Sequence, residues 1–331
     1  MAASTHSTTT KKNFVIGSRK SQLALAQTHL VRNTLQEIYP DFEFTVEAMS
    51  TTGDNILDKA LSKIGEKALF TKELEVALAD RRVDFVVHSF KDLPTVLPPG
   101  MEIGAIMERE DPRDALVLNA RNEGKSLETL PAGSVIGTSS LRRVAQLKRR
   151  YPHLKFADVI HRNTRLAKLD DENGPFSGII LAVAGLVRLN MGDRISCKLS
   201  SSDSLYAVSQ GALAIECREK DKEIMALLEP LNHANTRLMC LCERSLMRTL
   251  EGGCSVPIGV NTNLENNKLQ LHGLVASLDG QNVVEYKDEV NLEGAETREE
   301  REALAERLGN SVANQLLKDG ADKILAELAH K

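Results

Sequence analysis

The chain has 331 residues, which is more than one hydrophobic core usually contains, so we expect two or three domains. Hydrophobic residues make up 42% and charged residues 27% of the chain, which excludes an intrinsically disordered protein, and the formal net charge of −4 argues against general nucleic-acid binding. Five cysteines, an odd number spread from Cys197 to Cys254, do not form a disulfide framework, so a reducing, cytoplasmic location fits best.

The N-terminal residues 1–12 (MAASTHSTTTKK) are polar. They lack the apolar core of a signal peptide and the arginines of a transit peptide, so we expect a short disordered tail. No apolar run is long enough to span a bilayer, so we expect no membrane partner.

Apolar segments with strand-like and helix-like spacing alternate over the first two thirds of the chain, which indicates parallel or mixed sheets covered by helices on both faces. The last third differs, because a long helical stretch at 221–250 precedes two segments typical of an antiparallel meander and then helices rich in Ala, Leu and Glu. The predicted strands are 13–18, 42–50, 83–89, 134–140, 154–160 and 178–183, and the predicted helices are 21–39, 71–82, 141–151 and 164–171. Residues 96–104 interrupt this alternation, and a second α/β unit begins near residue 116.

The two predicted α/β units share a sequence pattern. VIGSRKSQLALAQ (15–27) and VIGTSSLRRVAQL (135–147) each contain a short strand, a glycine, hydroxyl residues, arginine and a helix. A helix N-terminus with hydroxyl caps and arginine beside it binds anions. Two such sites at matching strand ends indicate a two-lobed protein that holds a multiply anionic ligand in its cleft. The alternative is that the arginines are solvated and the serines are only N-caps. The serines concerned are Ser18, Ser21, Ser139 and Ser140.

Further charged residues follow predicted strands. Lys91 and Asp92 come directly after the strand 83–89, and Arg188 has the equivalent place in the second unit. Residues that contact ligands gather at such strand ends in α/β sheets. A lysine beside an aspartate can hold a carboxylate and move a proton, and the alternative is a surface ion pair worth about 0.5 kcal/mol.

Other residues lack the full pattern of a metal or protease site. We expect His88 to be a satisfied core histidine, and the basic run 148–151 (KRRY) to be a solvated helix end. Cys240 and Cys242 lie two apart on a predicted helix and point in different directions, without C-x-x-C or H-x-x-x-H partners, so no metal site is expected. Cys254 stands in a Gly-Gly loop, LEGGCSVPIG, where the backbone can approach a bulky covalent adduct.

Eight segments in order resemble the porphobilinogen deaminase (hydroxymethylbilane synthase) family. The likeness runs from about Phe14 to the C-terminus, and so many matching motifs make it highly specific. The segments are IGSRKSQLALAQ, STTGD, GEKALFTKELE, VDFVVHSFKDLP, REDPRDALV, IGTSSLRRVAQL, AVSQGALAIE and ERSLMRTLEGGCSVPIG.

The resemblance implies an enzyme of tetrapyrrole and haem biosynthesis. Such a transferase joins four porphobilinogen molecules head to tail, with loss of ammonia at each step, and releases linear hydroxymethylbilane. It works on a dipyrromethane cofactor that is bound by a thioether to a cysteine, here Cys254. Loss of ammonia gives a cationic azafulvene, which one carboxylate aimed at the pyrrole nitrogen stabilises.

The resemblance also implies the domain organisation. The first two domains are α/β lobes that resemble periplasmic binding proteins around a cleft, and the third is an α+β domain that carries the cysteine loop. The expected bounds are 1–12 for the tail, 13–114 with 212–232 returning for the first lobe, 115–211 for the second lobe, and 233–331 for the third domain.

Site residues carry over from the family motifs. Asp92 is the expected proton donor and cation stabiliser, and it contacts pyrrole nitrogens. The residues expected to bind the acetate and propionate groups of cofactor and substrate are Lys91, Arg19, Ser21, Arg142, Arg143, Arg165 and Arg188. The cap expected to hold cofactor carboxylates is Thr138, Ser139 and Ser140. The other residues expected to line the cleft are Gln27, Ser89, Gln210 and Gly211. The mobile segment expected near the cleft mouth contains Lys63 and Lys67, with Phe70 beside it.

One segment departs from the family pattern. Where the family reads Arg-Gly-Asn, two variable residues and Thr-Arg, this chain has DVIHRNTRL (158–166), one residue shorter and without the Arg-Gly pair. Arg165 matches the second arginine, and Arg162 is a candidate substitute for the first. The missing arginine helps to bind carboxylates during elongation, so we expect stalled enzyme–intermediate species. The mobile segment also has Glu66 and Ala68 where glycines are usual, which favours a stiffer segment.

Three alternatives stay open at this point. A non-catalytic two-lobed binding protein for a polyanionic small molecule predicts no covalent adduct. A thiol-dependent transferase with Cys254 as nucleophile predicts inactivation by alkylation. A nucleic-acid binder that uses 142–150 predicts salt-dependent affinity for DNA or RNA. The resemblance itself implies a monomer whose partner is porphobilinogen, with no nucleic acid.

Overall fold

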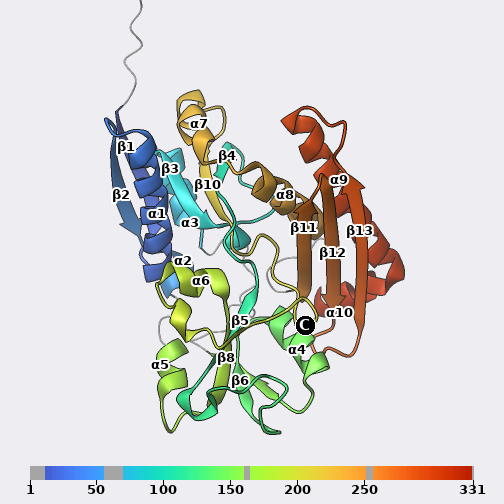
Figure 1. Ribbon diagram of the computed structural model, residues 1–331. Helices are drawn as coiled ribbons and strands as arrows, with labels where there is room; N and C mark the ends of the chain where they lie inside the picture. The colour runs from blue at the N-terminus through green and yellow to red at the C-terminus, as the bar shows by residue number, and fades with distance from the viewer. Residues whose placement is uncertain (1–11, 56–69, 160–164, 251–255, 330–331) are drawn as a thin grey trace, which may run out of the picture.

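The structure is a computed structural model that describes residues 12–55, 70–159, 165–250 and 256–329. These residues form two five-stranded mixed sheets and one three-stranded antiparallel sheet, each packed against helices. In Figure 1 the first sheet and its helices lie above the second, and the third sheet with its helices lies beside both.

The first sheet has the strand order β2-β1-β3-β10-β4. Strands β1 and β2 and strands β1 and β3 run parallel, whereas β10 is antiparallel to both of its neighbours. The chain therefore leaves this lobe after β4 and returns to it at β10. The strands are β1 (Asn13–Arg19), β2 (Glu43–Met49), β3 (Phe85–Ser89), β4 (Met101–Ile106) and β10 (Leu213–Arg218), and the helices are α1 (Gln22–Ile38), α2 (Thr52–Asn55), α3 (Lys72–Ala79) and α7 (Lys222–Leu228).

The second sheet has the order β7-β6-β8-β5-β9 and repeats the mixed pattern. Strand β6 is parallel to β7 and β8, and β5 is antiparallel to β8 and β9. The elements are β5 (Asp114–Leu118), β6 (Val135–Gly137), α4 (Leu141–Arg150), β7 (Lys155–Ala157), α5 (Arg165–Asp170), β8 (Phe176–Ala182), α6 (Val183–Arg188) and β9 (Cys197–Lys198).

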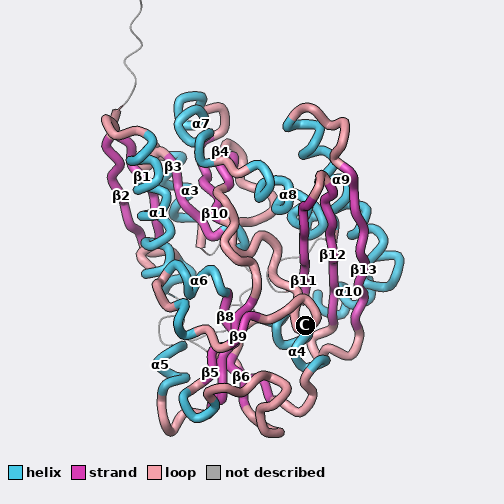
Figure 2. Tube along the Cα trace, in the orientation of Figure 1, coloured by secondary structure: helices cyan, strands magenta, loops and turns pink. Residues whose placement is uncertain are grey.

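The third unit is an antiparallel meander against two long helices, as Figure 2 shows. Leucine and valine side chains from the strands and helices form its core, and a capping box between Thr297 and Glu300 begins α9. The elements are α8 (Ala234–Thr249), β11 (Ile258–Glu265), β12 (Lys268–Ala276), β13 (Val283–Asn291), α9 (Arg298–Leu316) and α10 (Asp322–Ala329). Two α/β lobes with a C-terminal α+β domain are the expected fold class, which is thereby confirmed.

The structure corrects three details of the predicted elements. The stretch 221–250 is two helices, because Pro230 lies in a 3-10 turn between α7 and α8 and has no N–H for a continuous helix. The break at 96–104 contains the first residues of β4, since Met101 already pairs with β10. Four strands were not among the predicted strands: β5, β9, β10 and β11.

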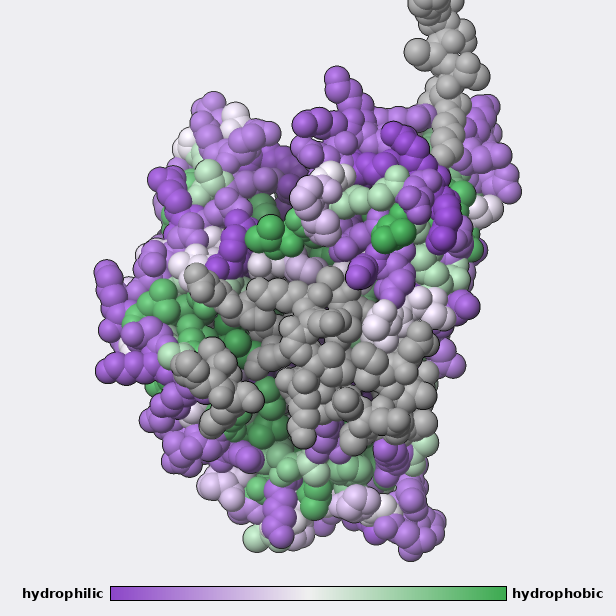
Figure 3. All heavy atoms as spheres, turned by 180° about the vertical axis from the view of Figure 1, so that it is seen from behind, coloured by the Kyte–Doolittle hydropathy of each residue, from purple (hydrophilic) through white to green (hydrophobic). Residues whose placement is uncertain are grey.

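On the face shown in Figure 3, most of the described residues are hydrophilic, and hydrophobic residues are visible in a few separate places. Among the described residues, none of the helices combines the length and the hydropathy that crossing a membrane requires.

Candidate active site

The end of strand β3 carries the first group of predicted site residues. Ser89 is the last residue of β3, and its hydroxyl is 2.9 Å from the Nε2 of Gln27 on helix α1. A 3-10 turn follows and presents Lys91 and Asp92, both half-buried. No described residue forms a hydrogen bond or ion pair with the Asp92 carboxylate. Among the described residues, the Asp92 carboxylate therefore has no structural partner.

Lys91 links the first lobe to the segment that leads back into it. Its Nζ is 3.4 Å from the Oε1 of Gln210. Burial lowers the pKa of Lys91 to about 8; the negative charges of Asp92 and Asp114 raise this pKa, and Arg143 and Arg142 lower it further. The ammonium group thus lies in a set of charges that are held close together.

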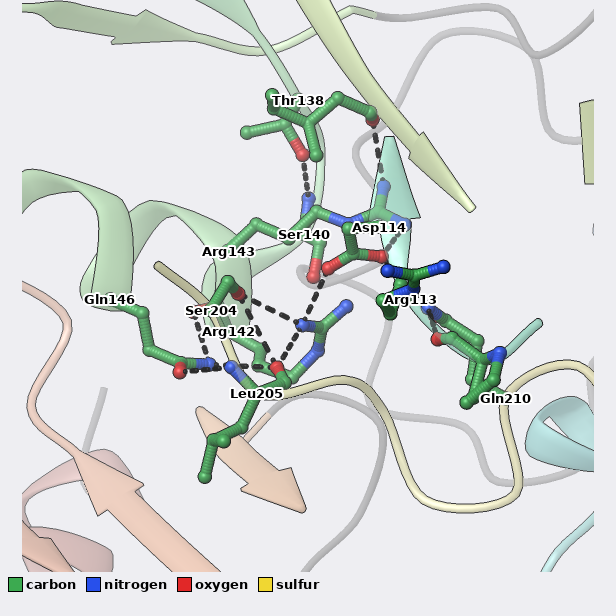
Figure 4. Close-up of polar contacts among 12 residues, drawn as sticks. Arg113, Asp114, Thr138, Ser140, Arg142, Arg143, Gln146, Ser204, Leu205 and Gln210 are labelled. Atoms are coloured by element: carbon green, nitrogen blue, oxygen red, sulfur yellow. Dashed lines mark hydrogen bonds and ion pairs between the residues drawn. The ribbon is translucent and has the colours of Figure 1, made fainter. Parts of the chain in front are cut away.

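The second lobe contributes two consecutive arginines in the first turn of helix α4. Arg142 and Arg143 are only 5% and 6% exposed, and both guanidinium groups contact the carboxylate of Asp114 (Figure 4). The alternative that these arginines are solvated is therefore wrong. Arg142 also donates to the carbonyl oxygen of Leu205 at 2.5 Å, and Arg143 donates to that of Ile180 at 2.8 Å.

The hydroxyl residues before α4 form a turn at the helix N-terminus. The hydroxyl of Thr138 accepts a hydrogen bond from the backbone N–H of Ser140 at 3.3 Å. Ser140 occupies the N-cap position, but its side chain makes no capping hydrogen bond. Ser139 donates to Asp158 and to the carbonyl oxygen of Val159 instead. The alternative that Ser139 and Ser140 only cap the helix is therefore wrong for their side chains, and the helix N-terminus keeps backbone donors without a side-chain cap.

The matching segment of the first lobe is arranged differently. Ser21 is the N-cap of α1, because its hydroxyl accepts a hydrogen bond from the backbone N–H of Ala24. Ser18 is on strand β1, and its hydroxyl accepts a hydrogen bond from the hydroxyl of Thr28 on α1. Arg19 forms an ion pair with Asp54, and its guanidinium lies 4.2 Å from the centroid of the Phe70 ring.

Arg188 and Gly211 also lie close together. Arg188 ends helix α6 and donates to the carbonyl oxygen of Gly211 at 2.6 Å. Burial lowers the pKa of Arg188 to about 10, and Glu110 opposes that shift. Gly211 has a φ of +90°, and a Cβ there would lie 2.3 Å from the carbonyl oxygen of Glu110, so only glycine fits.

The remaining predicted residues fall into two groups. Arg165 is the first residue of α5 and is half-buried. The others lie outside the described residues: Cys254, Lys63, Lys67, Glu66, Ala68 and Arg162.

Residues that were set apart from the site have structural roles. His88 is 5% exposed, and its Nε2 lies 2.8 Å from a carboxylate oxygen of Glu216, which confirms the predicted core histidine. Cys240 and Cys242 are buried, and burial raises the pKa of Cys240 to about 12 and that of Cys242 well above its ordinary value. Among the described residues, no group of His, Cys, Asp and Glu could hold a metal ion.

The structure adds two carboxylates that sequence reasoning did not assign. Asp54 faces Arg19, and Asp114 faces Arg142 and Arg143. Both lie in motifs that were already singled out, STTGD and REDPRDALV. A signal existed for Asp114, because it is the one acidic residue in the otherwise apolar strand β5 and therefore needs a buried cationic partner.

Contacts therefore run continuously from the first lobe to the second. Lys91 contacts Gln210, whose Nε2 donates to Asp114 at 2.8 Å, and Asp114 holds both arginines of α4. This arrangement gathers several charged groups around Lys91, including Asp92, which has no hydrogen-bond partner among the described residues.

Comparisons with known proteins agree with this arrangement. The family model described as "Porphobilinogen deaminase, dipyromethane cofactor binding domain" matches residues 14–226, and "Porphobilinogen deaminase, C-terminal domain" matches residues 237–318. Porphobilinogen deaminase of Synechococcus elongatus is 56% identical over 314 residues, and that of Nostoc sp. is 54% identical over 316 residues; each match covers 95% of this chain and 94% of the relative. The protein of Gloeobacter violaceus is 52% identical over 320 residues, covering 96% of this chain and 94% of the relative.

The solved structures that match this chain are more distant. The VFT2 domain of Bordetella pertussis BvgS is 12% identical with a TM-score of 0.39, over 69% of this chain and 92% of that domain. The periplasmic aliphatic sulphonate binding protein SsuA from Escherichia coli is 13% identical with a TM-score of 0.33, over 72% of this chain and 71% of that protein.

The family models and the curated relatives set aside a protein that only binds its ligand. The chain therefore belongs to the porphobilinogen deaminase (hydroxymethylbilane synthase) family: it is a transferase of porphyrin and haem biosynthesis that uses a dipyrromethane cofactor and has porphobilinogen as its substrate.

Proposed function

We propose that Asp92 is the carboxyl group that serves this reaction, and that Lys91 and the buried arginines hold the carboxylates of cofactor and substrate. The observation that supports this most directly is the pairing pattern. Asp92 has no hydrogen-bond partner among the described residues, whereas the cations beside it are held by Gln210 and Asp114. A carboxylate without a partner beside fixed positive charges is suited to stabilise a transient cation on a bound ligand.

The residues present fit a dipyrromethane cofactor, whose side groups are acetates and propionates. The Nε atoms of Arg142 and Arg143 are buried and have no hydrogen-bond partner, so each guanidinium keeps donor capacity for a carboxylate. The uncapped N-terminus of α4 and the Lys91 ammonium add further donors. When bound, the cofactor supplies the pyrrole carbon to which the next pyrrole is joined. Cys254 is the proposed thioether anchor, as the family motif implies.

Charge balance supports the same assignment. Each porphobilinogen brings two carboxylates, so a growing chain accumulates negative charge near the site. Arginine neutralises carboxylates with two parallel hydrogen bonds, and it stays charged even when buried. The proposed carboxylate-binding residues are Arg19, Ser21, Lys91, Arg142, Arg143, Arg165 and Arg188, supported by Gln27, Ser89, Gln210 and Gly211.

Asp92 acts on protons and charge in this proposal. As an acid it gives a proton to the aminomethyl nitrogen of porphobilinogen, which then leaves as ammonia. The resulting carboxylate faces the substrate cation and lowers its energy until the new carbon–carbon bond forms. The free α-carbon of the acceptor pyrrole forms the new bond and would lose its proton to this carboxylate, so the acid is restored for the next step. No metal ion or activated serine enters this sequence of steps.

We also infer a cytoplasmic monomer that does not bind nucleic acids. The burial and pairing of Arg142 and Arg143 support the last point, because these residues begin the basic run that would have to contact phosphates. Salt-dependent binding of DNA or RNA to the purified protein would contradict it.

The test is the Asp92→Asn variant, measured for turnover and for covalent loading. Asparagine keeps the shape but has no acidic proton and no negative charge, so we expect turnover to fall by at least about 100-fold, in the range for loss of a general acid. Intact-protein mass spectrometry is expected to find the cofactor adduct unchanged. Turnover close to that of the unmodified enzyme would remove Asp92 from this role.

A second variant tests the anchor. Cys254→Ser lacks a thiol for the thioether, so we expect a folded protein without a covalent adduct and without colour in Ehrlich's aldehyde reagent. An adduct of unchanged mass on this variant would assign the anchor to another residue. Alkylation of the unmodified, loaded enzyme tests the alternative of a transferase that uses Cys254 as a nucleophile. Alkylation would inactivate such an enzyme, whereas a Cys254 that already carries the cofactor would not react.

A further inference from the structure

Asp114 is a buried carboxylate in a strand that is otherwise apolar. It begins strand β5 and is 1% exposed, and each of the other residues of this strand is hydrophobic and buried. An ionised carboxylate in such a place is stable only with close cationic partners and hydrogen bonds. Its surroundings therefore determine what it does.

Both oxygens of this carboxylate are engaged, as Figure 4 shows. Oδ2 accepts from the NH1 of Arg142 at 2.8 Å. Oδ1 accepts from the NH2 of Arg143 at 2.7 Å and from the Nε2 of Gln210 at 2.8 Å. Burial raises the pKa of Asp114, but the two guanidinium groups outweigh burial and hold this pKa below its ordinary value, so the group is charged at neutral pH.

The two arginines need such a partner to remain where they are. They are consecutive residues in the first turn of α4, where the positive end of the helix dipole disfavours cations. Their charges also repel each other, and repulsion and dipole act together to displace the side chains. A single carboxylate between them opposes both effects and fixes the directions of the two planar groups.

Gln210 extends this arrangement to the other lobe. Its Nε2 donates to Asp114 and to the carbonyl oxygen of Pro112 at 2.7 Å, and its Oε1 accepts from Lys91. An amide has one acceptor and one donor end, so fixing its nitrogen on Asp114 orients its oxygen toward the ammonium group. The position of Lys91 therefore depends on Asp114 through a single intervening side chain.

We propose that Asp114 is a positioning residue for the known reaction, which sets the directions of Arg142, Arg143 and, through Gln210, Lys91 toward the carboxylates of cofactor and substrate. This inference rests on the proposed function, because it takes these cations to be the ones that bind the ligand carboxylates. One carboxylate for three cations leaves net positive charge, so the cluster stays attractive to an anion while its members are held in place. Asp92 is a second negative charge that acts on Lys91, and with it counted the cluster still has a net positive charge.

A purely structural ion pair is the alternative, and two substitutions separate it from positioning. Asp114→Asn keeps the shape and removes the charge. Asp114→Glu keeps the charge but is one methylene longer, so it displaces both guanidinium groups while leaving them paired. The extra methylene in a packed interior also lowers the stability of the folded protein. Asp84→Asn is the matched control, because Asp84 is also a buried carboxylate, bonded to Val15 and paired with Arg218, at a place away from these cations.

The measurements are KM and kcat for porphobilinogen over a range of pH, with the loaded state checked by intact-protein mass. We expect KM to rise at least about tenfold in both Asp114 variants, the loss that misplaced charge-assisted hydrogen bonds bring. In Asp114→Asn the break in the pH profile that belongs to Lys91 is expected to move to lower pH, because a negative charge that favours the ammonium form is gone. Asp84→Asn is expected to lose stability with KM and the pH profile unchanged.

The outcomes decide between the two roles. A folded, loaded Asp114→Asn with the KM and pH profile of the unmodified enzyme would overturn positioning and leave a structural pair. If Asp114→Asn does not fold, Asp114→Glu decides, because an unchanged KM in that variant overturns the proposal and a raised KM supports it. Failure of the proposed function is recognised separately, since Asp92→Asn would then turn over at a rate close to that of the unmodified enzyme, whatever the Asp114 variants do.

Discussion

Arg109 and Glu243 form a two-pronged ion pair between the segment that leaves the first lobe and helix α8 of the third domain. The guanidinium NH1 lies 2.6 Å from Oε1 and NH2 lies 3.0 Å from Oε2, and the two side chains are 4% and 0% exposed. The Nε of Arg109 also donates to the carbonyl oxygen of Gln210 at 2.7 Å. This pair therefore ties the third domain to the backbone that carries a site residue.

Glu243→Gln is expected to destabilise the protein strongly. Removing one charge from a fully buried pair leaves the other uncompensated, at a cost of roughly 3–5 kcal/mol. The matched control is Glu229→Gln, because Glu229 pairs with Arg298 at the surface, where such pairs contribute less than about 1 kcal/mol. Urea titration followed by circular dichroism measures both variants. Equal midpoints for the two would contradict the importance assigned to the Arg109–Glu243 pair.

Gly211→Ala is expected to disrupt the contact between the lobes. The added Cβ would meet the Glu110 carbonyl oxygen at 2.3 Å and would also require alanine at a φ of +90°. Gly100→Ala isolates the second effect, since Gly100 has a φ of +84° with no atom within 4 Å of the added Cβ, and it is expected to cost only about 1 kcal/mol. Thermal unfolding compares them. If both variants melt at the same temperature, the close approach of the Glu110 backbone is not what requires glycine at 211.

The activity is expected to fall as the pH rises through about 8. Burial lowers the pKa of Lys91 to about 8, so the free enzyme loses this positive charge, and with it a partner for ligand carboxylates, well below the ordinary lysine range. The profile of kcat/KM against pH measures the effect. Lys91→Arg stays charged and is expected to lose the break near pH 8, while any ionisation of the substrate remains in both profiles. A break that persists in Lys91→Arg would belong to another group.

Turnover is expected to stall because of the shortened segment 158–166. Fewer carboxylate-binding arginines weaken the hold on the growing chain. Mixing the purified enzyme with porphobilinogen and weighing the intact protein over time is expected to find adducts of successive pyrroles that persist. A variant that restores the family's Arg-Gly-Asn pattern is the control, and it is expected to clear them faster. Rapid release of hydroxymethylbilane by the unmodified chain, with no persistent adducts, would contradict this prediction.

The fold and the family were accessible from the sequence because their signals are local and repeated. Strand and helix periodicity predicted most elements of the two lobes, and several motifs in order indicated the reaction. The errors are also local in origin. Pro230 divides a stretch whose hydrophobic spacing is continuous, and β4 begins directly after a Pro-Pro-Gly segment that hides it. Strand β11 begins shortly after the Gly-Gly-Cys sequence that drew attention to Cys254.

The candidate site divides in the same way. Lys91, Asp92 and the arginines of α4 could be named in advance because residue type and position at a strand end point to anion binding. Their partners could not, since Asp114 is 28 positions from Arg142, and Glu243 is 134 positions from Arg109. No periodicity relates residues so far apart in the chain.

What the sequence determined by itself is the order of elements, the family and the chemical kinds of side chain at the site. Only the tertiary structure decided which charged side chains are paired. Asp114 forms ion pairs with two arginines, whereas Asp92, 22 positions before it, has no hydrogen-bond partner among the described residues. The physical reason is that pairing depends on distances between side chains and on their burial, and both are set by how the lobes pack.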